Sequence, residues 1–323
     1  MNFPKKKICV VGAGKWGMNH IKTLKKYNCL YGVVETDRSK HILLKQKYNN
    51  IDVFDSLDDA ILCNFDGYIL STPADSHFKL SSLLIKNNFP VLIEKPLALN
   101  EKDAKIIVDL SLRYKTQVMV GHVLLFHPAI IKIKELIDEG KIGKLQYIYS
   151  NRLNLGTIRS HENVFWSFAP HDISIFQYFI NKFPQYINSF GGAYLQKNVH
   201  DITITNFKYP NNIKAHIYTS WLHPFKEHRL VVIGDLGMLS FEDSSIEKNI
   251  YFYSKGYEWE NGIPVKKEGP TDIINYDNTK PLDNELNYFI NNLNKKIIKS
   301  DVENGLEVVK ILEKATKSLM GIN

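Results

Sequence analysis

Cysteine is scarce in this sequence, with three residues among 323. Cys9, Cys29 and Cys63 are odd in number and lie scattered in apolar segments, which argues against a disulfide framework and against a metal knuckle. No pair of histidines has the spacing of a zinc site. We therefore expect no structural disulfide and no bound metal, and a reducing, cytoplasmic location.

Long hydrophobic runs are also absent. No stretch approaches the roughly 18 consecutive apolar residues that a membrane-spanning helix needs. The amino end, with lysines at positions 5–7 before an apolar run at 8–11, is similar to the start of a signal peptide, but Gly12 and Gly14 interrupt that run. We interpret residues 8–11 as a first strand and expect a soluble protein without a membrane partner.

Negative charge is in the minority, with 34 Asp and Glu residues against 41 Lys and Arg and a net charge of +7. The lysines are spread along the whole chain, which predicts a solvated basic surface and gives no indication of nucleic-acid binding. The alternative is that part of this positive charge attracts a phosphorylated substrate into a cleft.

Length and patterning predict two domains, because a single core stops growing at roughly 250 to 300 residues. From residue 7 to 122, short β-branched runs alternate with amphipathic stretches, as in a parallel sheet wrapped by helices. The expected strands are residues 8–11, 30–35, 67–71, 90–94 and 117–121. The expected helices are residues 16–27, 39–48, 76–87 and 101–114, the last with Asn100 as its N-cap.

Beyond residue 144 the pattern changes to longer strand-like runs at 145–153, 202–209, 213–221 and 229–241, the last interrupted at 234–237. Helices are expected at 128–139, 170–181, 283–294 and 302–320. The fold class is therefore α/β. A doubly wound parallel sheet spans residues 1–122, and an α+β domain with an open, mainly antiparallel sheet spans residues 123–323.

The strongest motif is Gly12-Ala13-Gly14-Lys15-Trp16-Gly17, which directly follows the first expected strand and opens the first expected helix. In a dinucleotide-binding turn the first glycine allows the tight turn, the second lets the backbone approach the pyrophosphate, and the third permits close helix packing. The amino end of the helix supplies amides and a dipole for phosphate. The motif predicts a Rossmann domain that binds a nicotinamide dinucleotide.

Glu35 ends the second expected strand, eighteen residues after Gly17, where a carboxylate can accept hydrogen bonds from both adenosine-ribose hydroxyls and repel a 2′-phosphate. This favours NAD over NADP. Arg38 is a counter-signal because it could stack on adenine or hold that phosphate, although a surface arginine at a helix start is equally compatible with the sequence.

Two further motifs follow expected strands at the edge where a doubly wound sheet presents its ligand site. Ser71-Thr72-Pro73 could contact the ribose or the nicotinamide, with a plain strand exit as the alternative. Glu94-Lys95-Pro96 places a lysine on the same rim. A lysine desolvated beside a cofactor can exchange a proton with a substrate hydroxyl, so Lys95 is the first catalytic candidate, with an ordinary surface lysine as the alternative.

The second catalytic candidate is His171, within Trp166-Ser167-Phe168-Ala169-Pro170-His171-Asp172. Histidine titrates near neutral pH and suits acid–base chemistry, although a structural histidine is the alternative. Pro170 is expected to start a helix there. Asp172 could orient His171 or cap the helix, and we favour the cap because adjacent helical residues do not face each other.

The glycine turn, Ser71-Thr72-Pro73 with His77, Glu94-Lys95-Pro96 and Pro170-His171-Asp172 occur in an order that resembles the Gfo/Idh/MocA oxidoreductase family over nearly the whole chain. The resemblance implies a Rossmann domain, a carboxyl-terminal open sheet whose face forms a homodimer or homotetramer, and Lys95 and His171 as catalytic residues. Glu94 and Pro96 would shape the nicotinamide pocket. Many members have an aspartate where this chain has Ser167, which cannot exchange protons near neutral pH.

Residues 150–166 resemble a branch that acts on UDP-linked amino sugars, the UDP-N-acetylglucosamine 3-dehydrogenases. Arg152 and Arg159 could hold a diphosphate with their forked donors, and Asn154 or Asn163 could bind sugar hydroxyls. Trp166 belongs to the same stretch. The alternative is an edge-strand and loop cluster without a ligand.

The resulting hypothesis is an NAD-dependent dehydrogenase of a small-molecule nucleotide sugar. His171, assisted by Lys95, would remove the hydroxyl proton while NAD+ accepts a hydride from a ring carbon, expected to be C3, and the 3-keto product would be ready for a transaminase. Two alternatives are an oxidoreductase of a free sugar or polyol such as inositol, and a non-catalytic NAD-binding sensor.

Overall fold

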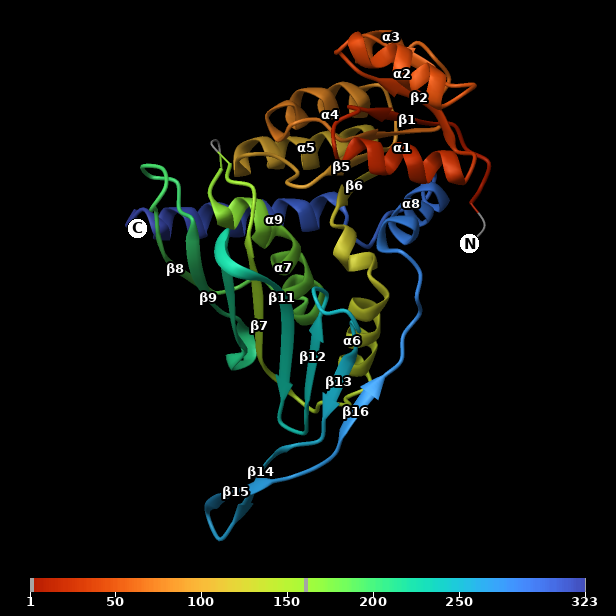
Figure 1. Ribbon diagram of the computed structural model, residues 1–323. Coiled ribbons are helices and arrows are strands. Elements are labelled where there is room, and N and C mark those ends of the chain that lie inside the picture. Colours follow the sequence, from red (N-terminus) through yellow and green to blue (C-terminus); the bar gives the residue numbers. More distant parts are fainter. Residues whose placement is uncertain (1–2, 160–161, 323) are drawn as a thin grey trace. The chain divides into compact units, whose positions relative to one another are not determined.

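The computed structural model describes residues 3–159 and 162–322 and divides into two compact units (Figure 1). Unit 1 comprises Met1–Phe126 and Thr279–Lys310, and unit 2 comprises His127–Asn278 and Ile311–Asn323. The single boundary expected after residue 122 would assign residues 279–310 to the second domain, whereas the structure returns them to the first unit. The hydrophobic pattern of a helix shows that one face is buried, but it does not show which sheet or helix covers that face.

Unit 1 is built around a six-stranded parallel sheet in the order β3-β2-β1-β4-β5-β6. The strands are β1 (Ile8–Val11), β2 (Leu30–Val34), β3 (Asp52–Phe54), β4 (Gly67–Leu70), β5 (Val91–Glu94) and β6 (Val118–Gly121). Four of them, β1, β4, β5 and β6, are buried along their whole length, as expected of parallel strands covered on both faces. The chain order reverses between β1 and β4, which is the point where doubly wound sheets bind ligands.

The helices of unit 1 are α1 (Gly17–Lys26), α2 (Ser39–Lys47), α3 (Leu57–Ala60), α4 (His77–Lys86), α5 (Glu101–Tyr114) and α8 (Pro281–Asn291), with 3-10 turns η1 (Ala74–Ser76) and η2 (Val123–Phe126). Helix α8 packs against α1 and η2. Helix α9 (Val302–Leu319) begins in unit 1 and ends in unit 2.

The expected strands and helices of residues 7–122 are confirmed to within one residue at each end. Asn100 is confirmed as the N-cap of α5, since its side-chain oxygen accepts the Asp103 N–H at 2.8 Å. The sequence did not predict β3 or α3, because elements of three and four residues are too short to show a hydrophobic period.

Unit 2 contains an eight-stranded sheet in the order β16-β13-β12-β11-β7-β10-β9-β8. The strands are β7 (Leu145–Leu155), β8 (Tyr186–Gly192), β9 (Ile202–Lys208), β10 (Lys214–Ser220), β11 (Leu222–Gly234), β12 (Met238–Glu242), β13 (Ile250–Tyr253) and β16 (Thr271–Ile274). All neighbouring pairs are antiparallel except β7 with β10, so the expected mainly antiparallel sheet is confirmed.

Two helices, α6 (Pro128–Asp138) and α7 (Val164–Ile180), and the 3-10 turn η3 (Pro210–Asn212) complete the main body of unit 2. Helix α7 packs against β7, β9 and β10. It starts six residues before the expected start at Pro170, because Asn163 caps it by accepting the Trp166 N–H at 3.0 Å. The proline therefore lies inside α7, where it cannot donate a helical hydrogen bond to the Trp166 carbonyl.

The strands β14 (Gly256–Glu260) and β15 (Ile263–Lys267) form a separate two-stranded hairpin that extends beyond β13 and β16 (Figure 1). Its turn, Asn261-Gly262, has positive φ at both residues, 52° and 79°, as a type I′ turn requires. Most of its side chains are exposed, including Trp259 at 73%. An isolated hairpin is at most marginally stable in water, so this one needs a further contact to be rigid.

Candidate cofactor and active site

The glycine turn has the backbone that its sequence predicts. Gly12 has a φ of 95°, and a side chain there would meet the Ser71 carbonyl oxygen at 2.7 Å. A side chain at Gly17 would lie 2.0 Å from the Gly12 carbonyl oxygen, so the start of α1 can approach the turn only without one. In contrast, a side chain at Gly14 would meet nothing within 4 Å. That open space is where a bound pyrophosphate could approach the backbone.

Glu35 holds the turn at the end of β2. Its Oε2 accepts the Ala13 N–H at 3.0 Å, its Oε1 accepts the Asp37 N–H at 3.0 Å, and Lys40 Nζ lies 3.3 Å from Oε2. The carboxylate is 8% exposed. Each carboxylate oxygen can accept more than one hydrogen bond, so Glu35 can fix the turn and still accept from ribose hydroxyls.

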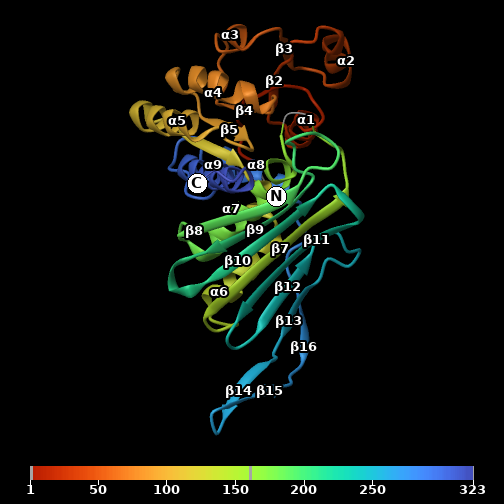
Figure 2. The ribbon, with the colours of Figure 1, turned by 90° about the vertical axis from the view of Figure 1, so that its left-hand side faces the viewer.

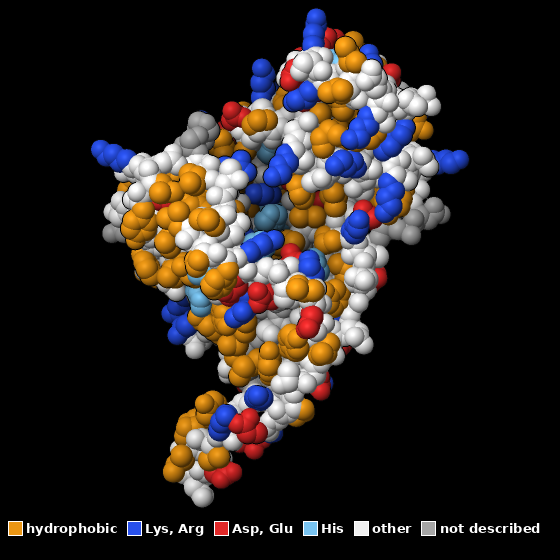
Figure 3. Space-filling model, viewed as in Figure 1, with side chains coloured by type: hydrophobic (Ala, Val, Ile, Leu, Met, Phe, Trp, Pro, Cys, Tyr) orange, Lys and Arg blue, Asp and Glu red, His pale blue; other side chains and the backbone are white. Residues whose placement is uncertain are grey.

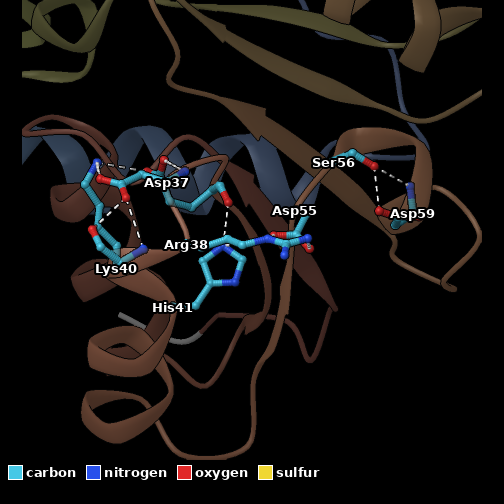
Figure 4. Close-up of polar contacts among 9 residues, drawn as sticks. Asp37, Arg38, Lys40, His41, Asp55, Ser56 and Asp59 are labelled. Atoms are coloured by element: carbon cyan, nitrogen blue, oxygen red, sulfur yellow. Dashed lines mark hydrogen bonds and ion pairs between the residues drawn. The ribbon is translucent and has the colours of Figure 1, made fainter.

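Arg38 is bonded to a carboxylate rather than oriented as a phosphate ligand (Figure 4). Its Nε and Nη2 donate to the two oxygens of Asp55, both at 2.9 Å, and this pair raises the pKa of Arg38 and lowers that of Asp55. The side chain is 81% exposed, so the pair is open to solvent. This geometry supports the surface-arginine alternative over a role in binding adenine or a 2′-phosphate.

The loops after β4 and β5 are joined by a buried histidine. His77, at the start of α4, places Nδ1 2.8 Å from the Pro96 carbonyl oxygen and Nε2 3.0 Å from the Thr72 carbonyl oxygen. Burial lowers the pKa of His77, so the ring is neutral near pH 7 and donates to one of these two carbonyls. The Ser71-Thr72-Pro73 and Glu94-Lys95-Pro96 segments are therefore adjacent, as the sequence predicted.

Glu94 connects the glycine turn to the lysine loop. Its Oε1 accepts the Trp16 indole N–H at 2.5 Å and lies 2.6 Å from Nε2 of the fully buried His20. Its Oε2 accepts the Lys95 N–H at 3.3 Å. A side chain at Gly121, on the neighbouring strand, would touch this carboxylate at 3.0 Å. The carboxylate thus fixes Trp16 and Lys95 relative to each other.

Two buried ionisable residues that interact electrostatically with Lys95 or Glu94 were assigned no role from the sequence. His122 is 1% exposed, and burial together with the Lys95 charge lowers its pKa to about 3. Glu285, on α8, is 0% exposed, and burial together with the Glu94 charge raises its pKa. His122 follows β6 directly and could have been found from its place at the carboxyl end of a strand. Glu285 carries no local signal of this kind.

The helix α7 carries His171 and Asp172 in its interior, not in its first turn. Asp172 accepts two hydrogen bonds from Arg152, on β7, at 2.6 and 2.8 Å, and one from the Ser150 hydroxyl at 2.5 Å. The expectation that Asp172 caps the helix is therefore wrong. Nε and Nη2 of Arg152 are thus engaged by Asp172 within unit 2, and the expectation that Arg152 binds a diphosphate stays a prediction.

The other predicted substrate residues of unit 2 divide into structural and exposed ones. Asn163 caps α7, and the Trp166 indole N–H donates to Thr316 Oγ1 at 2.8 Å, so both have structural partners. Arg159 is 59% exposed and lies 3.8 Å from Glu162, and Asn154 has a buried Oδ1 with no hydrogen-bond partner among the described residues. Arg159 and Asn154 therefore keep side-chain groups that a ligand could use.

A metal-binding cluster and a membrane-spanning helix are both absent from the described part of the chain. Residues 3–159 and 162–322 contain no group of three His, Cys, Asp or Glu side chains arranged to hold a metal ion. Within the same residues, no helix combines the length and the apolar character needed to cross a membrane.

Both halves of the chain match models of one protein family. Residues 6–122 match the oxidoreductase family with an NAD-binding Rossmann fold, Gfo/Idh/MocA, and residues 130–240 match the Gfo/Idh/MocA carboxyl-terminal domain. The first match covers the glycine turn, Glu35 and Lys95, and the second covers Arg152 and His171. These matches agree with the nucleotide site that the geometry of unit 1 indicates.

Individual relatives carry different enzyme names. A UDP-N-acetylglucosamine 3-dehydrogenase from Acidithiobacillus ferrooxidans is 22% identical over 273 residues, covering 83% of this chain and 83% of that protein. An inositol 2-dehydrogenase from Corynebacterium glutamicum is 24% identical over 144 residues, covering 43% of each chain. The chain likewise matches less than half of the length, 45%, of the rhizopine catabolism protein MocA from Rhizobium meliloti.

Solved structures share the fold along the whole chain. The crystal structure of the UDP-N-acetylglucosamine 3-dehydrogenase from Acidithiobacillus ferrooxidans has a TM-score of 0.85, with 98% of both chains covered and 18% identity. At that identity the likeness establishes the fold and leaves the substrate to other arguments.

Proposed function

Because the chain belongs to the Gfo/Idh/MocA family of NAD-binding oxidoreductases, we propose that it is a dehydrogenase of a nucleotide sugar. The group that it oxidises is a hydroxyl on the sugar ring. The substrate put forward is UDP-N-acetylglucosamine or a related UDP-amino sugar, oxidised at C3 to a keto sugar. The choice of this substrate rests on how much of each chain the sequence alignments cover. In sequence, the relative with this activity in its name aligns over 83% of both chains, whereas the inositol 2-dehydrogenases align over 43% to 54% of this chain.

The residues of unit 1 fit a bound dinucleotide. The open space beside Gly14 admits the pyrophosphate, and the carboxylate of Glu35 faces the turn at the end of β2, where it can bind the adenosine ribose. Ser71, Thr72 and Pro96 lie on the same rim of the sheet and are proposed to border the nicotinamide. When bound, NAD+ accepts the hydride that leaves the sugar carbon.

The proton chemistry is assigned to Lys95 and His171. In the proposed step His171 accepts the proton of the substrate hydroxyl as the ring carbon loses a hydride, for which NAD+ would be the acceptor, and the carbon becomes a ketone. Lys95 stabilises the negative charge that develops on the hydroxyl oxygen. Ser167 takes no part in proton transfer because a serine hydroxyl does not ionise near neutral pH.

Substrate binding is assigned to side chains that keep polar groups a ligand could contact. Arg159, with its exposed guanidinium, is the candidate for the diphosphate, and Asn154 is the candidate for a sugar hydroxyl. Arg152 is the buried partner of Asp172 in the same unit. The three cysteines are thiols, which supports the proposed cytoplasmic location because disulfides form mainly in oxidising compartments.

The substrate proposal is tested with purified protein, NAD+ and a panel of UDP-hexosamines. The expected result is NADH formation and a product two hydrogens lighter than UDP-N-acetylglucosamine. Failure to form a keto product from every UDP-hexosamine would contradict the substrate class. Turnover of myo-inositol instead would favour the polyol alternative, and NAD binding without any turnover would favour a sensor.

Replacement of Lys95 by methionine tests the catalytic assignment. We expect Lys95→Met to reduce turnover by about a hundredfold or more, the usual size of an acid–base or charge-stabilising contribution, while NAD remains bound. Lys102→Met, at an exposed position of α5, is the matched control and should retain full turnover. Equal turnover in the two variants would remove Lys95 from the mechanism.

A homodimer or homotetramer formed through the outer face of the sheet is part of the same proposal. We define the outer face as the side of the eight-stranded sheet opposite α7, which faces the viewer in Figure 2. It carries a hollow of about 840 Å³ lined in part by Tyr149, Arg229, Met238, Tyr251 and Tyr253. A solvated sheet face usually carries polar residues, and aromatic residues with Met and Arg are typical of protein interfaces.

A further inference from the structure

Helix α8 brings a carboxyl group into the interior of unit 1. Glu285 is 0% exposed, and neither of its carboxyl oxygens has a hydrogen-bond partner among the described residues. The two residues that precede Glu285 fix the helix to its neighbours. Asp283 accepts from Lys26 at 2.9 Å and from the Tyr27 hydroxyl at 2.7 Å, and Asn284 donates to the Phe126 carbonyl oxygen at 3.0 Å. Glu285 is therefore held in a defined buried position.

The charged groups around Glu285 favour its neutral form. The carboxylate of Glu94, at the end of β5, interacts electrostatically with Glu285, and Glu94 is itself 2.6 Å from Nε2 of His20 on α1. The turn η2 contributes Val, Leu and Phe side chains, none of which titrates. On α8 itself, Asp283 is engaged by Lys26 and Tyr27. Burial, and to a smaller extent the Glu94 charge, raise the pKa of Glu285 well above its ordinary value, which favours the neutral carboxylic acid.

Glu94 has capacity for one more donor. Its Oε1 already accepts from Trp16 and contacts His20, whereas its Oε2 receives the Lys95 N–H at the long distance of 3.3 Å. An ionised carboxylate offers about four lone-pair sites, and a protonated carboxyl group has one O–H to donate. A buried polar group is usually hydrogen-bonded, directly or through water, so an acid and an acceptor in one interior are expected to pair.

We propose that Glu285 is a positioning residue of the cofactor site, a neutral carboxylic acid that donates its proton to Glu94, directly or through one water molecule. This bond would hold the Glu94 carboxylate between Trp16 of the glycine turn and the Lys95 loop. The two segments that border the dinucleotide therefore depend on a helix that lies about 190 residues further along the chain. The inference concerns NAD binding alone and is independent of the sugar substrate.

The proposal is tested with Glu285→Gln and Glu285→Leu. Glutamine keeps a donor of the same shape and cannot ionise, so we expect its dissociation constant for NAD to stay within about twofold of the natural protein at pH 7. Leucine removes the donor, and we expect about tenfold weaker binding, the lower end for a hydrogen bond to a charged group. Leu286→Ala, at the next buried position of α8, is the control for lost packing. It should lower the melting temperature without weakening NAD binding.

Three results would overturn the proposal: equal NAD affinity in Glu285→Leu and the natural protein, binding as weak in Glu285→Gln as in Glu285→Leu, or weaker binding in Leu286→Ala. Infrared spectroscopy gives a second readout if the leucine variant fails to fold. The carbonyl band of a protonated carboxylic acid should be present in the natural protein at pH 7 and absent from Glu285→Gln. A spectrum without that difference would show that Glu285 is ionised and contradict the proposal.

Discussion

At the scale of single residues, the glycine turn offers a matched pair of substitutions. Gly14→Ala places a methyl group in open space, so we expect the protein to fold normally and bind NAD more weakly, because the methyl group occupies the approach of the pyrophosphate. Gly17→Ala places a methyl group 2.0 Å from the Gly12 carbonyl oxygen, so we expect a lower melting temperature as well as weaker binding. Calorimetry of each variant gives its melting temperature, and titration with NAD gives its binding affinity. Equal melting temperatures would contradict the described turn.

His122 makes a prediction about acid stability. Its pKa of about 3 in the folded protein lies below the ordinary value of 6.5, so the unfolded chain binds a proton that the folded protein excludes. The stability contribution is fully present above pH 6.5 and is lost as the pH falls toward 3. We expect His122→Leu to flatten the dependence of the unfolding free energy on pH between 6.5 and 4 by up to about 1.4 kcal/mol per pH unit. An unchanged slope in denaturant titrations would contradict the burial of a neutral imidazole.

The residues of the candidate site differ in how far the sequence could reveal them. Gly12, Gly17, Glu35 and Lys95 stand in motifs whose flanking strands and helices were predictable. The structure places Gly12, Glu35 and Lys95 directly after strands and Gly17 at the start of α1, as expected. Glu285 could not be found in this way, because its partner lies on an element distant in the sequence. Whether it is a solvated helix residue or a buried acid depends on what packs against α8.

At the scale of elements, the buried ion pair between β7 and α7 is the contact with the largest expected effect on stability. Arg152 and Asp172 have side chains that are 11% and 2% exposed. Asp172→Asn leaves the guanidinium charge without its counter-charge in the interior, and we expect a loss of about 3–5 kcal/mol in unfolding free energy. Arg38→Ala, which removes an exposed pair with Asp55, is the control and should leave the melting temperature nearly unchanged. Similar small effects in both variants would contradict the buried network.

Elements differ in predictability for physical reasons. The strands β1, β4, β5 and β6 of unit 1 are fully buried, contain β-branched residues and are bounded by turns, so their positions follow from composition. The β14–β15 hairpin was not predicted, although Asn261-Gly262 between alternating side chains is a strong hairpin signal. Pro264 lies inside β15, and a proline in a run argues against a strand unless the strand is at an edge. Both strands of an isolated hairpin are edges, which explains why the proline is tolerated.

At the scale of the whole molecule, aromatic residues on the outer face predict self-association. Tyr251 and Tyr253 border its hollow, and exposed apolar side chains also lie on the β14–β15 hairpin of the same unit (Figure 3). Replacement of both tyrosines by glutamate places like charges on a face that would meet a second copy of itself. We expect a lower molecular mass in sedimentation velocity than for the natural protein. Lys102→Glu, on α5 of unit 1, is the control and should keep the natural mass.

Assembly and substrate are the properties that the sequence left most open. A family resemblance identifies the nucleotide site, because the glycine turn and the Lys95 loop are built from local motifs. The substrate is bound by side chains such as Arg159 and Asn154, and sequence alone could not show that the neighbouring Arg152 is already bonded to a carboxylate within the protein. The choice of substrate is therefore determined by individual side-chain contacts and not by the fold.

One isotope measurement tests the central claim most directly. The protein is incubated with NAD+ and UDP-N-acetylglucosamine that carries deuterium at C3, and the NADH and the sugar product are analysed by mass spectrometry. The account predicts deuterated NADH together with a keto sugar that has lost the label. Unlabelled NADH with deuterium retained in the sugar would contradict oxidation at C3, and the absence of any NADH would contradict the proposed substrate.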